Sequence, residues 1–484
     1  MSNPKRLHPV VIFLLLFKAL KELMIPIIAA FVFGRGATSW DFPFTIYFII
    51  CGFIIFFIYG YFKWYTYTYE VDGVELKIKQ GIFIKKNRFI RRERIYSIDI
   101  TAGVFQRLFH LVAVKVETAG GGTEPEVVLA AVTKKDALQI KKQLLAVSVE
   151  NGNETNDAEL SVQSSSEIQW RLSNKNLVLA ALTSSGIGIA FMALVALASQ
   201  LEDWILNDYL INSFGYIFQS SVAVIIVAAT MIFFLSWLVS IIGTILKYGN
   251  FIIRKKDDEI EIARGILEKR QLTISITRIT AIRVVESLFR QPFGLATVYV
   301  ESAGGGSKDE QLSTVLFPLV RIKELKDHLG EVIPDFCFEQ PIEPLPKRAK
   351  MRYLIRKVVP GAIIAGFIAF FIPYGFIGAA LVLVLALLIG NQQFKDAGFG
   401  KNDHFLWISY RALSKTLVII PKQRIQALEI KQSLFQQLRT LFTIQASILT
   451  SIVGKAFRTV DISEKQKEEI LTWYSYEETK GKKV

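Results

Sequence analysis

Three stretches of this sequence share one short pattern, and their spacing decides how the chain is organised. They read Arg94-Ile95-Tyr96-Ser97-Ile98-Asp99-Ile100, Arg278-Ile279-Thr280-Ala281-Ile282-Arg283-Val284 and Arg424-Ile425-Gln426-Ala427-Leu428-Glu429-Ile430. Eleven residues after each arginine comes a phenylalanine (Phe105, Phe289, Phe435), and six residues further on a leucine (Leu111, Leu295, Leu441). Three copies with one internal spacing indicate a chain built from repeated units.

The first two copies are the most alike. A shift of 184 residues aligns 81–122 with 265–306 without a gap, and seventeen of these forty-two positions are identical. A further shift of 146 residues brings in a weaker third copy at 411–447, where Arg411 replaces the glycine that begins the other two. The third unit is therefore predicted from its spacing and position.

Around this pattern the sequence predicts β-strands. Val74, Leu76 and Ile78 alternate with charged residues, and the same period of two recurs near 259–262 and 406–410. Each copy ends in a helical pattern, at 133–146, 319–329 and 463–475. We therefore expect three domains of short antiparallel strands, each closed by a C-terminal helix.

Long apolar runs separate these β-rich blocks. They lie at about 9–33, 42–62, 177–199, 216–246, 353–372 and 374–391. A helix that crosses the hydrocarbon core needs roughly 20 apolar residues, so the sequence predicts six spans in three hairpins. The last two runs meet at Pro373-Tyr374-Gly375, which indicates a tight turn, although one long kinked helix is the alternative.

The first apolar run contains three charged residues, Lys18, Lys21 and Glu22. Charge inside a membrane is costly, so such residues often mark a polar path through a helix bundle. The alternative is an i,i+4 pair of Lys18 with Glu22 while the long side chains reach toward the interface. The sequence leaves both interpretations open.

Composition and charge place the chain in a membrane. Hydrophobic residues make up 51% of the sequence and charged residues 21%, with a formal net charge of +14. The predicted loops 34–41 and 200–215 contain Arg35 alone among Lys and Arg, whereas the other flanks of the spans are basic. The positive-inside rule therefore puts all large polar segments and both termini in the cytoplasm of a multi-pass cell-membrane protein.

The predicted fold class is an α+β membrane protein in which hairpins alternate with cytoplasmic β-barrel or sandwich domains. The expected hairpins are 1–62, 171–247 and 352–392; the expected domains are 63–147, 248–333 and 393–478; the expected linkers are 148–170 and 334–351.

The repeated residues carry a family resemblance. The Arg-Ile-x-Ser/Ala-Ile core, the downstream Phe and Leu, and the endings Glu117-Thr118-Ala119-Gly120-Gly121-Gly122 and Glu301-Ser302-Ala303-Gly304-Gly305-Gly306 resemble the bacterial pleckstrin-homology (PH) domain of YdbS-like membrane proteins. Three such domains, each with a hairpin, resemble the YdbT-like members. The resemblance implies a PH-like barrel, a smaller single-domain membrane relative as partner, and a role in envelope protection against antimicrobial peptides. It implies no catalytic residues.

The residues themselves predict no catalytic, cofactor or metal site. The four histidines are scattered, and neither Cys51 nor Cys337 lies near one of them in sequence. Two cysteines also fit a reducing compartment better than a disulfide framework. We therefore expect no enzyme activity and no cofactor.

One strongly basic stretch stands out in the first domain. It contains Lys85, Lys86, Arg88, Arg91 and Arg92 and ends at the motif arginine Arg94. A basic cluster beside a membrane attracts an anionic leaflet, whereas a solvated face or an acidic protein partner is the alternative. Nucleic acid is not expected, because aromatic side chains do not interleave with a longer basic surface. The three motif arginines Arg94, Arg278 and Arg424 are expected to be structural, since even the diverged third copy keeps its arginine.

Two functions remain open from the sequence. The first is a non-catalytic membrane protein whose domains bind one another, a smaller relative, or anionic lipid. The second is a transporter or channel with regulatory domains, suggested by Lys18, Lys21 and Glu22.

Overall fold

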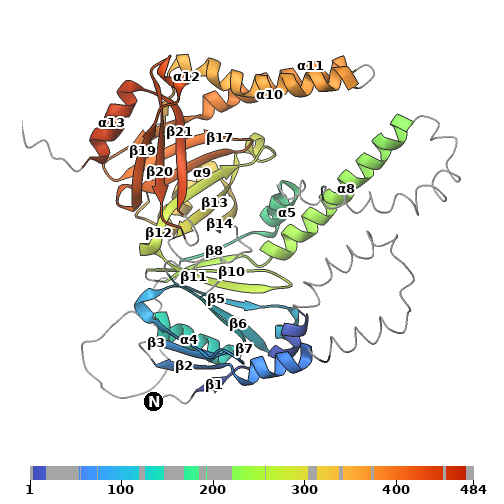
Figure 1. The fold of residues 1–484 in the computed structure, drawn as a ribbon, viewed down its shortest axis with the longest axis vertical. Helices are drawn as coiled ribbons and strands as arrows, with labels where there is room; N and C mark the ends of the chain where they lie inside the picture. Colours follow the sequence, from blue (N-terminus) through green and yellow to red (C-terminus); the bar gives the residue numbers. More distant parts are fainter. Residues whose placement is uncertain are drawn as a thin grey trace, which may run out of the picture.

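The computed structural model describes residues 4–17, 54, 56–72, 75–118, 126–145, 168–184, 192, 221–256, 258–302, 313–336, 342–371, 375–450 and 454–475. Within this part of the chain, three β-rich domains lie in one row, with domain 1 at the bottom of Figure 1 and domain 3 at the top. Each domain contains a four-stranded and a three-stranded antiparallel sheet and ends in a helix.

The elements repeat in the same order in each domain. Domain 1 contains β1 (Lys5–Arg6), β2 (Thr68–Asp72), β3 (Glu75–Gln80), β4 (Lys86–Arg91), η1 (Arg92–Arg94), β5 (Ile95–Ala102), α3 (Val104–Leu108), β6 (Leu111–Thr118), β7 (Val127–Thr133) and α4 (Lys134–Leu145). Domain 2 contains β8 (Ile168–Arg171), β9 (Ile252–Lys256), β10 (Glu259–Arg264), β11 (Lys269–Ser275), η3 (Ile276–Arg278), β12 (Ile279–Glu286), η4 (Gln291–Phe293), β13 (Leu295–Ser302), β14 (Thr314–Arg321) and α9 (Ile322–Val332). Domain 3 contains β15 (Glu343–Pro344), η6 (Lys347–Ala349), β16 (Gly398–Lys401), β17 (Phe405–Arg411), β18 (Lys415–Pro421), η7 (Lys422–Arg424), β19 (Ile425–Lys431), α12 (Leu434–Gln437), β20 (Leu441–Ile448), β21 (Lys455–Ser463) and α13 (Glu464–Tyr474).

The three closing helices agree with the sequence analysis. Ser463 precedes α13 and its hydroxyl accepts a hydrogen bond from the backbone N–H of Gln466. Thr133 does the same for Asp136 at the start of α4, at 3.1 Å. Both caps satisfy a backbone donor that a helix leaves unpaired at its first turn.

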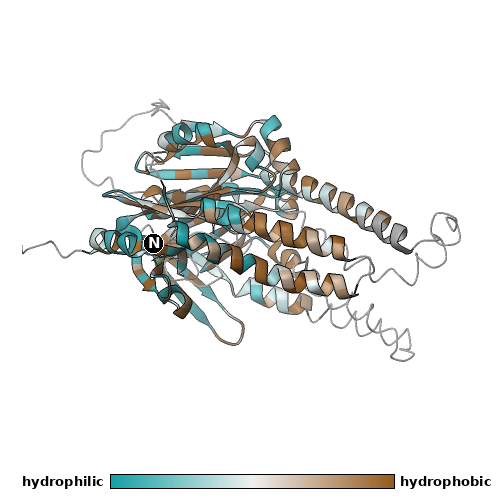
Figure 2. Ribbon diagram, turned by 90° about the horizontal axis from the view of Figure 1, so that it is seen from above, coloured by the Kyte–Doolittle hydropathy of each residue, from teal (hydrophilic) through white to brown (hydrophobic). Residues whose placement is uncertain are grey.

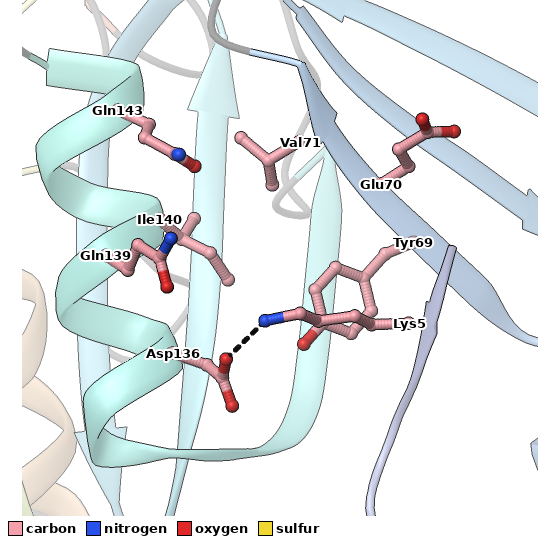
Figure 3. Close-up of a pocket in the computed structure, with 8 residues that line it drawn as sticks. All are labelled: Lys5, Tyr69, Glu70, Val71, Asp136, Gln139, Ile140 and Gln143. Carbon is pink, nitrogen blue, oxygen red and sulfur yellow. Dashed lines mark hydrogen bonds and ion pairs between the residues drawn. The ribbon is translucent and has the colours of Figure 1, made fainter. Parts of the chain in front are cut away.

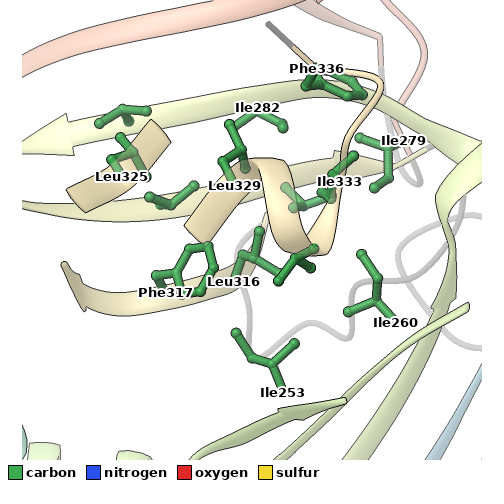
Figure 4. Packing of buried hydrophobic residues seen from close by; sticks show 14 of the residues in the cluster. Ile253, Ile260, Ile279, Ile282, Leu316, Phe317, Leu325, Leu329, Ile333 and Phe336 are labelled. Carbon is green, nitrogen blue, oxygen red and sulfur yellow. The ribbon is translucent and has the colours of Figure 1, made fainter. Parts of the chain in front are cut away.

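Each domain has its own apolar core between its sheets and its closing helix. In domain 2, alternate side chains of β9, β10 and β12 point inward at Ile253, Ile260 and Ile282, and Leu325 and Leu329 of α9 cover them (Figure 4). The helix presents residues four apart on one face, and the strands present every second residue. The two periods therefore bury one continuous apolar layer.

The first strand of each domain lies before the segment predicted to form its hairpin, which differs from the expected boundaries. β1 pairs with β2, β8 with β9 and β15 with β16, although the expected hairpin 1–62 and linkers 148–170 and 334–351 were placed outside the domains. Each segment predicted to form a hairpin therefore lies between the first and second strands of its domain. These first strands are too short, at two to four residues, to show a period in the sequence.

Three helices of the described residues are long and apolar enough to cross a membrane: Thr230–Tyr248 in α8 (Ser221–Tyr248), Lys347–Phe371, which includes α10 (Lys350–Phe371), and α11 (Phe376–Asp396). They correspond to the fourth, fifth and sixth predicted spans. The other predicted spans lie largely outside the described residues. The long apolar helices, brown in Figure 2, extend from the same side of the β-rich body.

The helices α10 and α11 are separate and pack against one another, as the hairpin interpretation expects. A Cβ added at Gly361 would lie 2.9 Å from the Cβ of Ala386, and one at Gly390 would lie 3.2 Å from the Cα of Leu354. Small residues let two membrane helices approach closely without a hydrophobic driving force between them. α5 (Asn174–Leu182) lies beside α8, and just beyond its end Ser184 accepts a hydrogen bond from Thr244 of α8 at 3.1 Å.

The domains are joined by strand pairing across their boundaries. One seven-stranded sheet runs β7-β6-β5-β11-β10-β9-β8, and a second runs β14-β13-β12-β18-β17-β16-β15. The pair β5–β11 is named here junction 1/2, and the pair β12–β18 is named junction 2/3. The three-stranded sheet of one domain thus continues into the four-stranded sheet of the next, and the three domains form one body.

Candidate functional site: an open, basic sheet edge beside the membrane

The basic stretch of domain 1 forms an edge strand. β4 pairs with β3 on one side, and no strand among the described residues pairs with its other side. The equivalent strands of the other domains are covered, because β11 pairs with β5 and β18 pairs with β12. At the far end of the row, β19 is likewise an edge strand, whereas its equivalents β5 and β12 are the strands that cover a neighbour.

Burial shows the consequence of this difference. Phe89 of β4 is 61% exposed, while Thr273, which occupies the equivalent position of β11, is 3% exposed. Five of the six residues of β4 are exposed, and Ile90 alone is buried. β4 therefore presents a phenylalanine and several cations around an unpaired backbone edge.

The basic side chains spread along β4 rather than forming one cluster. Residues 56–65 are helical and lead into β2, whose first residue Thr68 pairs with Lys79 of β3. Lys86 begins β4 opposite Gln80, so Lys85 and Lys86 lie toward the helix end of the domain. Arg91 pairs with Glu75 at the other end, about five residues or ~17 Å away. A single flat membrane surface cannot therefore contact all the predicted basic residues equally.

Arg88 lies between these ends and has partners within the domain. It donates to the carbonyl of Glu126 at 2.6 Å and lies 3.4 Å from that residue's carboxylate. Arg92 begins η1 and is partly buried, whereas Lys85, Lys86 and Arg91 are exposed.

The turn between β3 and β4 carries exposed apolar residues beside the first lysines. Phe83 is 95% exposed and Ile84 73% exposed. The turn needs Gly81, which has a φ of +124° and whose added Cβ would lie 1.9 Å from the carbonyl oxygen of Ile84. The equivalent Gly265 donates to the carbonyl of Gly249 directly after α8, which places this turn at the base of a membrane helix in domain 2.

A second apolar loop on each domain follows the strand after the motif arginine. Its exposed side chains are Val104, Phe105, Leu108 and Phe109 in domain 1, Leu288, Phe289 and Phe293 in domain 2, and Leu434, Phe435 and Leu438 in domain 3. Phe105 contacts Phe17 with ring centroids 4.6 Å apart, and the carbonyl of Phe435 accepts from Arg352 of α10. These loops therefore lie where the membrane helices leave the domains.

The motif arginines lie at the domain boundaries. Arg278 of η3 donates to the carbonyl of Ile95 in domain 1, and Arg424 of η7 donates to the carbonyl of Thr277 in domain 2. Each guanidinium thus reaches the motif segment of the preceding domain. Arg94 is exposed and makes no equivalent contact among the described residues.

Buried ion pairs complete the two junctions. Arg270 of β11 binds Asp99 of β5 at 2.7 Å, and Asp99 is 1% exposed. At junction 2/3, Lys455 of β21 binds the fully buried Glu301 of β13 at 2.8 Å, and Arg283 binds the same carboxylate at 3.1 Å. Burial lowers the pKa of Lys455, while the nearby Glu301 acts in the opposite direction. None of these residues was singled out from the sequence beyond their place in the repeats.

Two of the cavities among the described residues are lined by charged side chains. One, of about 80 Å³, lies between β2 and α4; in it Lys5, Tyr69 and Asp136 approach one another, and Lys5 binds Asp136 at 2.6 Å (Figure 3). Burial, followed by the charge of Asp136, raises the pKa of Tyr69 to about 12. The other cavity, of about 400 Å³, lies at the base of α10 and α11 and is lined by cations that include Arg356, Lys357 and Arg458.

The described residues contain no group of three or more His, Cys, Asp and Glu side chains that could hold a metal ion. Lys18, Lys21 and Glu22, which the sequence predicts to lie within the membrane, and the glycine runs 120–122 and 304–306 lie outside the described residues.

Comparison with known proteins agrees with this repeated architecture. The family described as Bacterial PH domain matches residues 13–148, 189–333 and 359–478. The chain belongs to the bacterial PH domain family. Its three PH domains are the three β-rich units described above, and the third is included despite its diverged glycines.

A relative is similar over nearly the whole chain. The UPF0699 transmembrane protein YdbT of Bacillus subtilis (strain 168) is 34% identical over 495 aligned positions, which cover 99% of this chain and 100% of the relative. Together with the three long apolar helices, this similarity supports a membrane protein with three PH domains.

Proposed function

We propose that this chain is a non-catalytic scaffold of the bacterial cell membrane, whose three PH domains lie against the cytoplasmic face and hold protein partners there. One observation carries the proposal: strands pair across both domain boundaries, while β4 and β19 remain at sheet edges. An open sheet edge presents backbone donors and acceptors to a strand of another chain, which is a common mode of protein recognition.

The expected partners are a smaller membrane relative with a single PH domain or a second copy of this chain. A single domain has the same two kinds of edge, so it could extend the row at either end. Anchoring in one membrane raises the effective concentration of such partners, and this favours pairing through a modest surface. The cytoplasmic placement rests on the charge bias of the loops.

The test is co-purification of the full-length protein from detergent-solubilised membranes, with partners identified by mass spectrometry. Phe89→Asp places a charge on the open edge, and Leu138→Asp on the exposed face of α4 is the matched control. We expect a stable PH-domain partner with wild type and with Leu138→Asp, and at least about fivefold less with Phe89→Asp. If wild type retains neither a protein partner nor anionic lipid, the scaffold proposal is wrong.

From the family resemblance we propose that this assembly helps to protect the cell envelope against antimicrobial peptides. In that setting, a strain that lacks the protein is expected to be more sensitive to membrane-active peptides, and Phe89→Asp to restore resistance less well than Leu138→Asp. Equal sensitivity of the deletion strain and its parent would remove the protective role but not the scaffold.

Anionic-lipid contact is the second candidate function, and the cation-lined cavity at the base of α10 and α11 favours it. Lys357 and Arg458 line this cavity without an ion pair among the described residues, whereas Arg356 binds Asp461 at 2.9 Å. Basic pockets at the ends of membrane helices suit anionic headgroups. Native mass spectrometry of the purified protein is expected to show retained anionic lipid, lost in Lys357→Gln with Arg458→Gln and kept in the α4 control Lys134→Gln with Lys135→Gln.

The transporter or channel alternative rests on Lys18, Lys21 and Glu22. In α8 and α11 the described lysines lie near the helix ends, at Lys247 and Lys395, whereas α10 carries Arg356 and Lys357 about two turns inside its start. Neutralising Lys18 and Glu22 together tests this alternative: an unchanged cellular phenotype excludes a required polar path there.

A further inference from the structure

The two junctions of the chain use one strand register. At junction 1/2, Lys269 pairs with Ala102; at junction 2/3, Lys415 pairs with Glu286. The 146-residue shift makes Lys415 the equivalent of Lys269, and the 184-residue shift makes Glu286 the equivalent of Ala102. The same two surfaces therefore meet in the same way twice within one chain.

Each of these two surfaces occurs once more, with no strand of the described residues paired to it. β4 of domain 1 is the equivalent of β11 and β18, and β19 of domain 3 is the equivalent of β5 and β12. Ala281 in β12 is fully buried, whereas its equivalent Ala427 in β19 is exposed. The β4 edge of domain 1 and the β19 edge of domain 3 are therefore complementary, and they lie at opposite ends of the row.

We infer that β4 binds β19 of a second copy of this chain, head to tail, in the register that the two junctions share. This inference rests on the scaffold function proposed above and names its partner. The register places Glu429 opposite Arg88, and Leu428 opposite Phe89. The equivalents of Leu428 and Phe89 at junction 2/3 are Ile282 and Ile419, both fully buried.

The charges of the two edges match this pairing. Lys86 and Glu429 occupy the positions of Arg270 and Asp99, which form the buried ion pair of junction 1/2. Lys431 would lie opposite Lys86, and Glu429 already binds Lys431 at 2.6 Å. The Glu429 carboxylate would therefore lie among Lys431, Lys86 and Arg88, and opposite charges on facing strands stabilise a sheet.

The motif arginine of domain 1 gains a partner in the same arrangement. Arg278 and Arg424 donate to carbonyls at residues 95 and 277, whose equivalents in domain 3 are Ile425 and Gln423. The exposed Arg94 would donate to that segment of the second copy. Lysines on an edge strand can also simply prevent pairing. Phe89 is exposed on β4, Arg94 follows it as the equivalent of two boundary arginines, and β19 carries the matched acid Glu429; together they indicate a binding edge instead.

The direction of the row permits this growth in a membrane. The three domains are stacked along one axis, and the apolar helices leave them on one side (Figures 1 and 2). A second copy added by the same pairing keeps its hairpins on that side. Because the interface joins two different surfaces, repeated addition gives a ring or an open filament in the plane of the membrane.

Disulfide trapping tests the register. In the full-length chain, Cys51 and Cys337 are first replaced by Ser. One version then carries Arg88→Cys and one affinity tag, and a second version carries Glu429→Cys and a different tag. The two versions are mixed in detergent and oxidised. We expect a disulfide-linked dimer bearing both tags. Arg283→Cys with Val418→Cys, the equivalent internal pair, should form an intramolecular bond; Arg88→Cys with Leu428→Cys, which lie on opposite faces, should not react.

A charge exchange provides the second measurement. Arg88→Glu alone should weaken self-association about 3- to 10-fold, because the new carboxylate lies opposite Glu429, and Arg88→Glu with Glu429→Arg in the same chain should restore it. Mass photometry of the detergent-solubilised protein reads the distribution of oligomers. Neither variant touches the internal junctions, so folding of the row provides an internal reference.

The outcomes separate this inference from the scaffold proposal. If the internal pair forms and the Arg88–Glu429 pair reacts no more than the off-register pair, the head-to-tail contact is wrong. If wild type then still retains a single-domain PH relative, the scaffold stands with another occupant at β4. If it retains no partner and no anionic lipid, both proposals fail.

Discussion

Junction 1/2 and junction 2/3 share a strand register but differ in the charges that they bury. Junction 1/2 places Asp99 against Arg270, whereas at junction 2/3 the equivalent positions hold Arg283 and Thr416, and the buried acid is Glu301 on a neighbouring strand. The backbone pairing and the apolar column are therefore the constant part of the interface. The ion pairs lie at different positions in the two junctions. We therefore infer that strand pairing determines how two domains meet, and that the ion pairs add stability and specificity to that contact.

The largest expected effect is at junction 2/3. Glu301 has no exposed surface and faces both Arg283 and Lys455, so Glu301→Gln leaves two cations near an uncharged buried group. Removing one member of a buried ion pair costs about 3–5 kcal/mol. Hydrogen exchange of the β12 and β18 amides should show this loss in the free energy of opening. Glu429→Gln at the open edge should leave those amides unchanged.

Removing the buried acid of junction 1/2 should lower the free energy of opening by a smaller amount. Asp99→Asn leaves the mostly buried Arg270 without its anion, and we expect a loss of about 2–3 kcal/mol in the free energy of opening the β5–β11 pair. Replacing both residues, with Asp99→Leu and Arg270→Met, should recover most of that loss, because an apolar pair needs no charge compensation. A double variant as unstable as Asp99→Asn would show that the charges themselves hold junction 1/2 together.

Two motif arginines allow a covered edge to be compared with an open one: Arg278 lies at junction 1/2, and Arg94 lies beside the open edge of β4. Arg278→Ala removes a charged donor from the carbonyl of Ile95 and should destabilise junction 1/2 by about 1–2 kcal/mol. Arg94→Ala removes an exposed side chain and should change the stability of the isolated chain by less than about 0.5 kcal/mol. Thermal unfolding in detergent measures both. Equal losses would mean that Arg94 has a structural role within domain 1.

The repeats made much of this architecture predictable. The three domains, their closing helices and the caps at Thr133 and Ser463 follow from local patterns that the sequence carries directly. The first strands β1, β8 and β15 were missed, because a strand of two to four residues has no readable period and its pairing partner lies beyond a whole hairpin.

The candidate site was predictable only in part. The basic stretch was visible as composition, but its position at an uncovered edge depends on pairing between domains, which is a long-range contact. One signal was available in the repeat alignment: β4 has Arg88 at the position where β11 has Leu272 and β18 has Val418. A strand that becomes polar at positions where its copies are apolar has lost an internal neighbour.

The smallest expected effect lies at the outer end of the row, where an exposed ion pair replaces the buried ones. Hydrogen bonds from Lys5 and then Thr133 lower the pKa of Asp136 below its usual value. Because the pKa is lowered in the folded state, the stabilisation is present above the unfolded value of about 3.9 and is lost as the pH falls through the folded value. The Lys5 side chain is largely exposed, so we expect only about 0.5 kcal/mol. The measurement is the free energy of opening of the β2 amides, from hydrogen-exchange rates divided by the intrinsic exchange rate at each pH. This free energy should fall at low pH in wild type and in Lys142→Met, and should fall less in Lys5→Met. An identical pH dependence in Lys5→Met would show that the ion pair does not hold β1 in place.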